Sequence, residues 1–167
     1  MSEQKVTKEN QLVVFSLGKE CYGVDISIVR EIIQLQPVTK VPGTPYSVEG
    51  MINLRGSVIP IVDLRKRFKL HSTSNDKDTR IVVVNCNKQD TGIIVDSVEE
   101  VLRIPVDSIE PPSTIVTGEK AKHLRGIVKL SQKLIILLDM DEVLARVGTF
   151  DVNQATDGSA LAEPAMA

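Results

Sequence analysis

The sequence has almost no aromatic residues: no tryptophan, two tyrosines and three phenylalanines among 167 residues. Proteins that bind single-stranded nucleic acid use aromatic rings on which bases stack, and they normally carry a basic face. Here the formal net charge is −2. Composition therefore argues against a nucleic-acid-binding small β-barrel, which remains only as the alternative function. With 42% hydrophobic residues and so few rings, the core must consist of Val, Ile and Leu, and Val and Ile favour strands.

Cysteines and long apolar runs are also scarce. Cys21 and Cys86 are the only cysteines, which is too few for a disulfide framework or a metal cluster. We expect them to be buried or half-buried thiols. No apolar run approaches the ~20 residues that cross a bilayer, and the first residues contain no apolar signal core. The sequence thus predicts a cytoplasmic protein without direct membrane insertion.

Recognisable catalytic motifs are missing: there is no nucleophile elbow, no phosphate-binding loop and no His-Glu-x-x-His. We expect the two histidines, His71 and His123, to be exposed surface residues and not general bases. Four aspartates stand at predicted strand ends, where they typically cap turns or helix starts: Asp25, Asp63, Asp96 and Asp139. A hydrolase based on Asp63 or Asp139 would lack a nucleophile or metal companion. We therefore predict a protein that is not an enzyme and uses no cofactor or metal ion.

The sequence does contain an internal duplication. The segment from Leu12 to Ile33 recurs from Ile81 to Leu102 at a constant offset of 69 positions. A second repeated segment, at an offset of 70, aligns the Leu-Arg-Gly tripeptide at 54–56 with the one at 124–126. Each copy then continues into an apolar strand that ends in Asp63 or Asp139. Two copies of this length indicate two related β subdomains, because a solenoid needs at least three shorter repeats.

We place the first copy at about 12–70 and the second at about 80–147. Neither copy is large enough to be very stable alone, so the two are expected to interlock and share a hydrophobic core within one domain, 10–147. Residues 1–9 are polar and are expected to form a flexible leader. Residues 148–167 contain three acidic residues and no Lys or Arg, which predicts a disordered acidic tail.

Short strands separated by turn signals predict an all-β protein built from small barrels. Asp25 or Ser27 can cap a short helical turn after the first hairpin. Pro60 demotes its strand to an edge strand or a bulge. The basic run 65–69 could grip phosphates, but its apolar flanks favour a solvated helix face. Strands are expected at 11–17, 21–24, 31–35, 50–54 and 58–62, with the plan repeated in the second copy.

Arg55 stands out among the polar residues. The Leu-Arg-Gly tripeptide is predicted to form a hairpin turn in both copies, because glycine permits the backbone of a tight turn. An arginine on a rigid turn can anchor a partner through its planar fork. It can equally be a surface arginine beside a turn glycine. The residues alone leave both interpretations open.

Several motifs resemble a known family. The sequence reads Asn-Leu-Arg-Gly at 53–56, followed by Ile-Pro-Ile-Val-Asp-Leu at 59–64. Leu-Val-Val-Phe-Ser-Leu-Gly at 12–18 and Tyr-Gly-Val-Asp-Ile at 22–26 belong to the same pattern. Over roughly residues 10–147 the chain resembles the bacterial chemotaxis coupling protein family, CheW.

The resemblance implies two tandem five-stranded SH3-like barrels around a shared core. It implies an adaptor that couples the cytoplasmic helical hairpin of chemoreceptors to the regulatory domain of the histidine kinase CheA. Such a protein would be a monomer in isolation, bind no nucleic acid, and be recruited to the inner face of the membrane through receptor arrays.

The resemblance also assigns binding residues. Residues of the first copy are implied in kinase binding: Ile32, Thr39, Val41 and Gly50. Receptor binding, in a groove between the barrels, is assigned to Val29, Glu31, Arg55 and the second-copy Val98.

Overall fold

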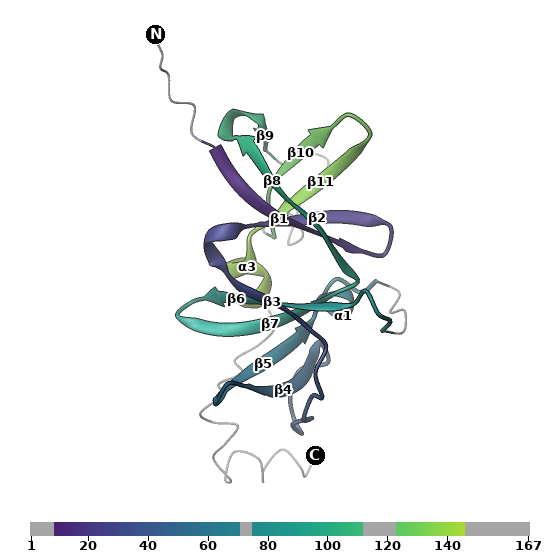
Figure 1. The fold of residues 1–167 in the computed structure, drawn as a ribbon, viewed down its shortest axis with the longest axis vertical. Coiled ribbons are helices and arrows are strands. Elements are labelled where there is room, and N and C mark those ends of the chain that lie inside the picture. Colours follow the sequence, from purple (N-terminus) through teal and green to yellow (C-terminus); the bar gives the residue numbers. More distant parts are fainter. Residues whose placement is uncertain (1–8, 71–74, 112–122, 146–167) are drawn as a thin grey trace.

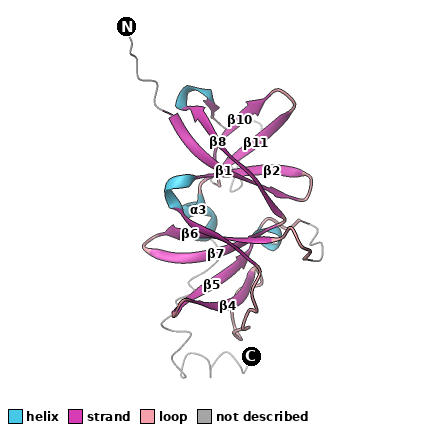
Figure 2. Ribbon diagram, in the orientation of Figure 1, coloured by secondary structure: helices cyan, strands magenta, loops and turns pink. Residues whose placement is uncertain are grey.

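The computed structural model describes residues 9–70, 75–111 and 123–145, which form two β-sheets stacked along the long axis of the molecule (Figure 1). Helices are few and short (Figure 2). The all-β prediction is therefore confirmed. The predicted leader, apart from Glu9, and the predicted acidic tail lie outside the described residues.

Six strands form the sheet at the top of Figure 1, here called the upper sheet, in the order β8-β1-β2-β11-β10-β9. Their bounds are β1 Glu9–Leu17, β2 Glu20–Asp25, β8 Ser97–Pro105, β9 Ile109–Glu110, β10 Leu124–Leu130 and β11 Lys133–Leu138.

Five strands form the lower sheet, in the order β3-β6-β7-β5-β4. They are β3 Val29–Gln34, β4 Val48–Leu54, β5 Ser57–Asp63, β6 Arg80–Cys86 and β7 Gln89–Val95. The short helices are η1 Ile26–Ile28, α1 Leu64–Arg67, η2 Val106–Ser108 and α3 Met140–Ala145.

The two copies of the repeat exchange their first hairpins. The β1–β2 hairpin of the first copy lies in the upper sheet, where it is flanked by β8 and β11 of the second copy. The β6–β7 hairpin of the second copy lies in the lower sheet between β3 and β5 of the first. Both exchanged hairpins pair antiparallel on one side and parallel on the other. Each sheet thus contains strands from both copies.

The second half of the repeat has a different offset from the predicted one. The same bulge occurs in β4 before Gly50 and in β10 before Gly126, which lies 76 positions later. Asp139 likewise lies 76 positions after Asp63. The expected offset of 70 is therefore wrong, and Arg125 is the bulged residue of β10 instead of a hairpin-turn residue. The residues equivalent to Arg55 and Gly56 are Ser131 and Gln132.

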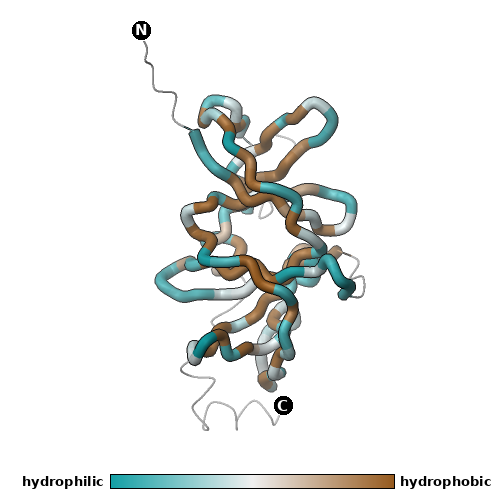
Figure 3. The backbone as a smooth tube through the Cα atoms, in the orientation of Figure 1, coloured by the Kyte–Doolittle hydropathy of each residue, from teal (hydrophilic) through white to brown (hydrophobic). Residues whose placement is uncertain are grey.

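The exchanged strands β1 and β6 are buried on both faces and therefore serve two cores each. Each sheet, with the core that it encloses, is here called a unit. In β1, Val13 and Phe15 contribute to a central core between the sheets, whereas Leu12 and Val14 contribute to the interior of the upper unit. Strand β6 divides its side chains in the same way between the central core and the lower unit. Figure 3 shows hydrophobic residues along the strand middles and hydrophilic residues at several hairpin turns. The predicted shared core is this central cluster.

Gly50 closes the lower sheet into a barrel. After β3 the chain crosses the sheet edge, and Thr39 pairs with Met51 of β4 through two N–H···O bonds of 2.8 Å. A Cβ atom at Gly50 would lie 2.1 Å from the Thr39 carbonyl oxygen, and Gly50 has a φ of +146°. Only glycine therefore allows this close approach.

We predict that Gly50→Ala lowers the free energy of unfolding by about 3 kcal/mol or more, because the new methyl collides with backbone that cannot swing aside. Urea unfolding measures this loss. Gly18→Ala is the control: Gly18 also has positive φ, +62°, but has open space around it, so it should lose only about 1 kcal/mol. Equal losses would show that the Thr39 contact imposes no restriction.

Pro60 lies in an inner strand, so the expected edge position is wrong. Strand β5 pairs with both β4 and β7. The parallel pairing with β7 begins only at Ile61, opposite Gly92, so Pro60 precedes that ladder. On the other side Pro60 stands opposite Met51, next to the bulged end of β4. A proline is tolerated here because the ladder that would need its N–H has not yet started.

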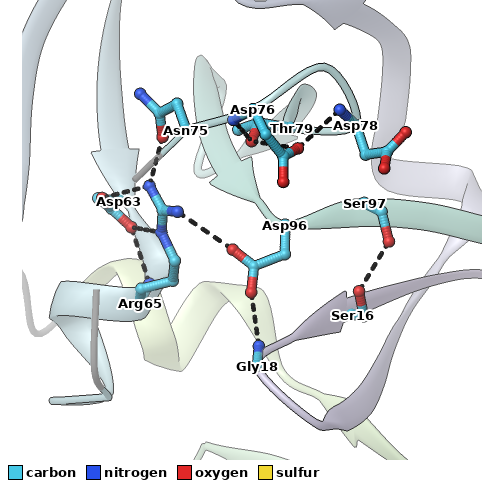
Figure 4. A network of polar contacts seen from close by, with 10 residues as sticks. All are labelled: Ser16, Gly18, Asp63, Arg65, Asn75, Asp76, Asp78, Thr79, Asp96 and Ser97. Carbon is cyan, nitrogen blue, oxygen red and sulfur yellow. Dashed lines mark hydrogen bonds and ion pairs between the residues drawn. The ribbon is translucent and has the colours of Figure 1, made fainter. Parts of the chain in front are cut away.

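Arg65 is the main departure from the predicted solvated helix face, because its side chain is only 4% exposed. It forms a fork to Asp63, with Nε–Oδ1 at 3.0 Å and Nη2–Oδ2 at 3.1 Å. Its other bonds go to Asp96 at 3.1 Å and Asn75 at 2.8 Å (Figure 4). Asp96 in turn accepts the Gly18 N–H at 2.6 Å. The network thus joins the end of β5, the β7–β8 connection and the β1–β2 turn.

Burial alone would lower the pKa of Arg65, but the hydrogen bonds and charges of Asp63 and Asp96 raise it above its ordinary value. The guanidinium stays charged, and both carboxylates have a partner. One buried cation therefore connects the lower unit to the upper one.

Three of the four strand-end aspartates cap helices, as predicted. Asp25 accepts the Ser27 N–H before η1, and Asp63 accepts the Arg65 N–H before α1. Asp139 accepts two N–H groups of α3. Asp96 differs because its carboxylate accepts hydrogen bonds from Arg65 and from the Gly18 N–H of the β1–β2 turn in place of a helix N–H.

The prediction for the cysteines is confirmed, whereas that for His123 is wrong. Cys21 is half-buried and Cys86 is buried; burial, with the nearby charge of Asp141, raises the pKa of the Cys86 thiol to about 12. His123 is also buried, with its ring 6.1 Å from that of Phe68 and its Nε2 3.3 Å from Nη2 of Arg67. His71 lies outside the described residues.

We predict that Arg65→Met lowers the free energy of unfolding by about 3–5 kcal/mol, because Asp63 and Asp96 are left without their cation. Urea unfolding measures the effect, and it is followed by circular dichroism because the chain has no tryptophan. Arg103→Met is the control; its side chain is 66% exposed and 4.0 Å from Glu9, so the loss should stay below about 1 kcal/mol. Similar losses for both variants would contradict a structural role for the network.

Candidate partner-binding site

The structure brings two of the predicted receptor-facing residues into direct contact. Arg55, in the turn between β4 and β5, forms a fork to Glu31 on β3, with Nη1–Oε2 at 2.6 Å and Nη2–Oε1 at 2.7 Å. The Arg55 side chain is 70% exposed and that of Glu31 is 28% exposed. A two-bonded arginine–carboxylate pair has a defined orientation. The site is therefore an ordered charge pair on the surface of the lower unit.

The turn that carries Arg55 has an unusual backbone. Arg55 has a φ of +52° and Gly56 a φ of +90°, the signs of a type I′ hairpin turn. The side chain of Asn53 accepts the Gly56 N–H at 2.8 Å and closes the turn. Strands β4 and β5 pair up to Leu54 and Ser57, so only two residues form the loop. The arginine is thus displayed from a short, internally bonded turn.

The pKa of Glu31 is lowered, mainly by the hydrogen bonds from Arg55 and further by the charge of that arginine. Partial desolvation and the charge of Asp90 act in the opposite direction. The carboxylate is consequently ionised at neutral pH and keeps Arg55 as its partner.

Val29 and Val98, the other predicted receptor-facing residues, are structural equivalents. Val29 pairs with Val84 at the bulge of the β3–β6 ladder, and Val98 pairs with Phe15 at the matching bulge of the β1–β8 ladder. Both are partly buried and pack against the central core. The structure therefore places these valines at the junction of the units and the ion pair on one unit only.

The predicted kinase-facing residues differ in their environments. Ile32 is 39% exposed on β3, Thr39 is exposed, and Val41 is half-buried. Gly50 is buried beneath Thr39, so these two lie together. Gly50 therefore supports the segment after β3 and offers no side chain to a partner.

A neighbouring charge pair was not predicted from the sequence. Arg30 Nε lies 3.3 Å from Asp90 Oδ1, which also accepts the Asn85 side-chain N–H at 2.7 Å. Arg30 is the bulged residue of β3, and Asp90 follows the β6–β7 turn. The pairing of β3 with β6, and of β6 with β7, brings these residues together, so no local sequence signal could have identified them.

The chemistry of the described residues suits binding. Across ranges 9–70, 75–111 and 123–145, no group of three or more His, Cys, Asp or Glu side chains could hold a metal ion. No helix within these ranges is long and apolar enough to span a membrane. The surface described above carries two paired arginines, Arg55 and Arg30, together with exposed aliphatic residues.

Comparisons with known proteins agree with this arrangement. A family model described as the CheW-like domain matches residues 11–148. The chain is 34% identical over 139 residues to a chemotaxis protein CheW of Klebsiella aerogenes, covering 83% of this chain and 84% of the relative. It is 36% identical over 137 residues to a Helicobacter pylori chemotaxis protein CheW, covering 81% and 82%.

Similarity also extends to solved structures. A crystal structure of the scaffolding protein TtCheW from Thermoanaerobacter tengcongensis aligns with a TM-score of 0.76 at 42% identity. The alignment covers 81% of this chain and 92% of that protein. Sequence and fold thus point to the same group of proteins.

The Glu31–Arg55 pair predicts a pH dependence. Because the folded-state pKa of Glu31 is depressed, the pair stabilises the fold above the unfolded carboxyl pKa, ~4.3, and this contribution disappears as pH falls through the lowered value. In Arg55→Gln, the pKa of Glu31 should return toward its ordinary value. NMR titration of the Glu31 carboxyl carbon measures this. Lys129→Gln, which removes a different exposed cation, should leave the Glu31 titration unchanged; an unchanged titration in Arg55→Gln would contradict the ion pair.

Proposed function

The chain belongs to the CheW-like domain family, and from this premise we propose that it couples chemoreceptor cytoplasmic tips to the histidine kinase CheA. At the coarser level it is an adaptor of chemotaxis signalling, as the names of its relatives and the scaffolding protein of similar fold indicate. The finer proposal is that receptor state reaches the kinase through this chain. In that role it works without catalysis and is recruited to receptor arrays at the inner face of the membrane.

The Glu31–Arg55 pair is the observation that carries the receptor side of the proposal. A guanidinium has five N–H donors and a flat face, and its two hydrogen bonds to Glu31 fix its plane while most of the side chain stays exposed. A receptor helix can therefore meet an arginine whose orientation is already set. Preorganisation of this kind reduces the entropy lost on binding.

We assign Val29 and Val98 to the same receptor contact as apolar neighbours. Both lie where the units meet, and a helix bound along this junction would find aliphatic surface from each. The equivalence of the two valines supports a partner that touches both units.

The kinase side of the proposal uses the segment that follows β3. Ile32 is a large apolar side chain with 39% exposure, Thr39 forms the barrel closure, and Val41 follows two residues later. Apolar residues surrounded by polar ones are typical of protein interfaces. Gly50 contributes by letting Thr39 dock on β4.

We predict that Arg55→His leaves the fold intact and weakens the receptor contact by ~2 kcal/mol, about thirtyfold, because an oriented anchor is lost from an exposed turn. Receptor-dependent stimulation of kinase activity should fall accordingly. The measurement is kinase activity in reconstituted receptor arrays, beside a binary pull-down with the receptor fragment.

Two variants control this experiment. Arg125→His changes an exposed arginine within β10, where the side chain is 3.9 Å from Asp25, and should keep stimulation near the wild-type level. Ile32→Glu should instead weaken binary binding to the CheA regulatory domain, with Val101→Glu at the equivalent position of β8 as its own control. Normal stimulation by Arg55→His, or loss of its fold, would refute the receptor assignment.

A further inference from the structure

Arg55 adopts a backbone conformation that its own side chain does not favour. The left-handed region is accessible to glycine and, at lower cost, to asparagine and aspartate, but it is unfavourable for other L-residues. The β6–β7 turn has the favoured asparagine at its first loop position, Asn87 with a φ of +53°, followed by Lys88 with a φ of +62°. At the β4–β5 turn the first residue is Arg55, with a φ of +52°. Something other than local preference therefore holds the arginine there.

Asn53 supplies that restraint. Its side-chain oxygen accepts the Gly56 N–H at 2.8 Å, so it spans the two loop residues from outside the turn. Asn53 is itself exposed, which means that its hydrogen bond is not needed to satisfy a buried group. Asparagine side chains stabilise turns in this way by bonding to nearby backbone N–H groups.

The equivalent hairpin of the upper sheet forms without such a restraint. Its loop residues, Ser131 and Gln132, are not among the described residues with positive φ. Lys129 stands in the place of Asn53, and its Nζ lies 3.4 Å from Glu110. A two-residue connection of β10 and β11 is thus made without an asparagine. Of these two hairpins, only the one with the left-handed arginine has an asparagine two residues before its loop arginine or serine.

We propose that Asn53 is a positioning residue, which holds the β4–β5 turn in its left-handed form so that Arg55 forms its fork to Glu31 and faces the partner. For receptor binding this rests on the proposed function, but the positioning itself is a property of the free protein. Loss of the Asn53 bond would let the turn relax toward a form in which the two N–H groups of Arg55 no longer face Glu31 together.

The test compares Asn53→Ala with Asn53→Asp, which keeps a side-chain oxygen that can accept the Gly56 N–H. Two readouts belong to the turn itself: hydrogen exchange of the Gly56 amide and the pKa of Glu31, both by NMR. In Asn53→Ala the Gly56 amide should exchange faster and the pKa of Glu31 should rise toward its ordinary value. In Asn53→Asp the amide should remain protected. Lys129→Ala, at the equivalent position of β10, should alter neither readout.

Receptor binding supplies the third readout. Asn53→Ala should bind a receptor cytoplasmic fragment about fivefold more weakly, with Asn53→Asp close to wild type and kinase regulatory-domain binding unchanged in both. A merely structural role would shift the thermal unfolding midpoint and both binding reactions together. If Asn53→Ala leaves the Gly56 exchange rate and the Glu31 pKa as in the wild type, the positioning proposal is wrong.

Failure of the proposed function gives a different pattern. If the turn readouts respond to Asn53→Ala but Arg55→His still binds the receptor fragment normally, Asn53 positions Arg55 and the receptor assignment fails. If Arg55→His loses receptor binding while Asn53→Ala disturbs the turn without affecting that binding, positioning for the receptor is overturned.

Discussion

The exchange of hairpins between the two copies is the constraint on which the structure depends. Strands β1 and β6 each pair with strands of the other copy, and both present one face to the central core and the other to the interior of a unit. Apolar area is thereby removed from water on both faces of a strand, which compensates for the few aromatic residues. The two units cannot separate without exposing these strands. A fixed relative placement of the units follows, and any partner that touches both meets a rigid surface.

The duplication is conserved in the backbone but not in its charges. Arg65, which holds Asp63 and Asp96 at one junction of the units, has Asp141 as its counterpart 76 positions later. Arg55 likewise corresponds to Ser131. The lower unit therefore carries both the buried Arg65 and the exposed Arg55. The two units of a nearly symmetric scaffold thus differ chemically. A scaffold with distinct partners needs such a difference, because identical faces would not discriminate between them.

Local signals were sufficient for much of this fold. The short strands with their turns, and a cap by Asp25 or Ser27, depend on neighbours in sequence, and the structure confirms the strands and Asp25 as the cap. The offset of 69 is visible from the sequence letters alone, and the pairing of the exchanged hairpins agrees with it. The errors concern features set by tertiary pairing: the burial of Arg65 and His123, the inner position of Pro60, and the offset of the second half. Identical residues suggested that the two Leu-Arg-Gly tripeptides are equivalent. The shared bulges show instead that Gly50 is equivalent to Gly126. For the site, the resemblance supplied Glu31 and Arg55 separately, but only the fold shows that they touch.

Hairpin exchange also has a consequence for biosynthesis. Leu12 of β1 stands opposite Leu102 of β8, so the first hairpin to leave the ribosome must wait for a partner encoded 90 residues later. At about 5–20 residues per second, that wait is on the order of ten seconds. During this interval a strand rich in Val, Leu and Phe has no sheet to join. Pairing across such sequence separations also slows folding, because loop closure precedes the gain from contacts. The nascent chain therefore leaves the apolar side chains of β1 without their final neighbours during synthesis, although the finished protein keeps them buried.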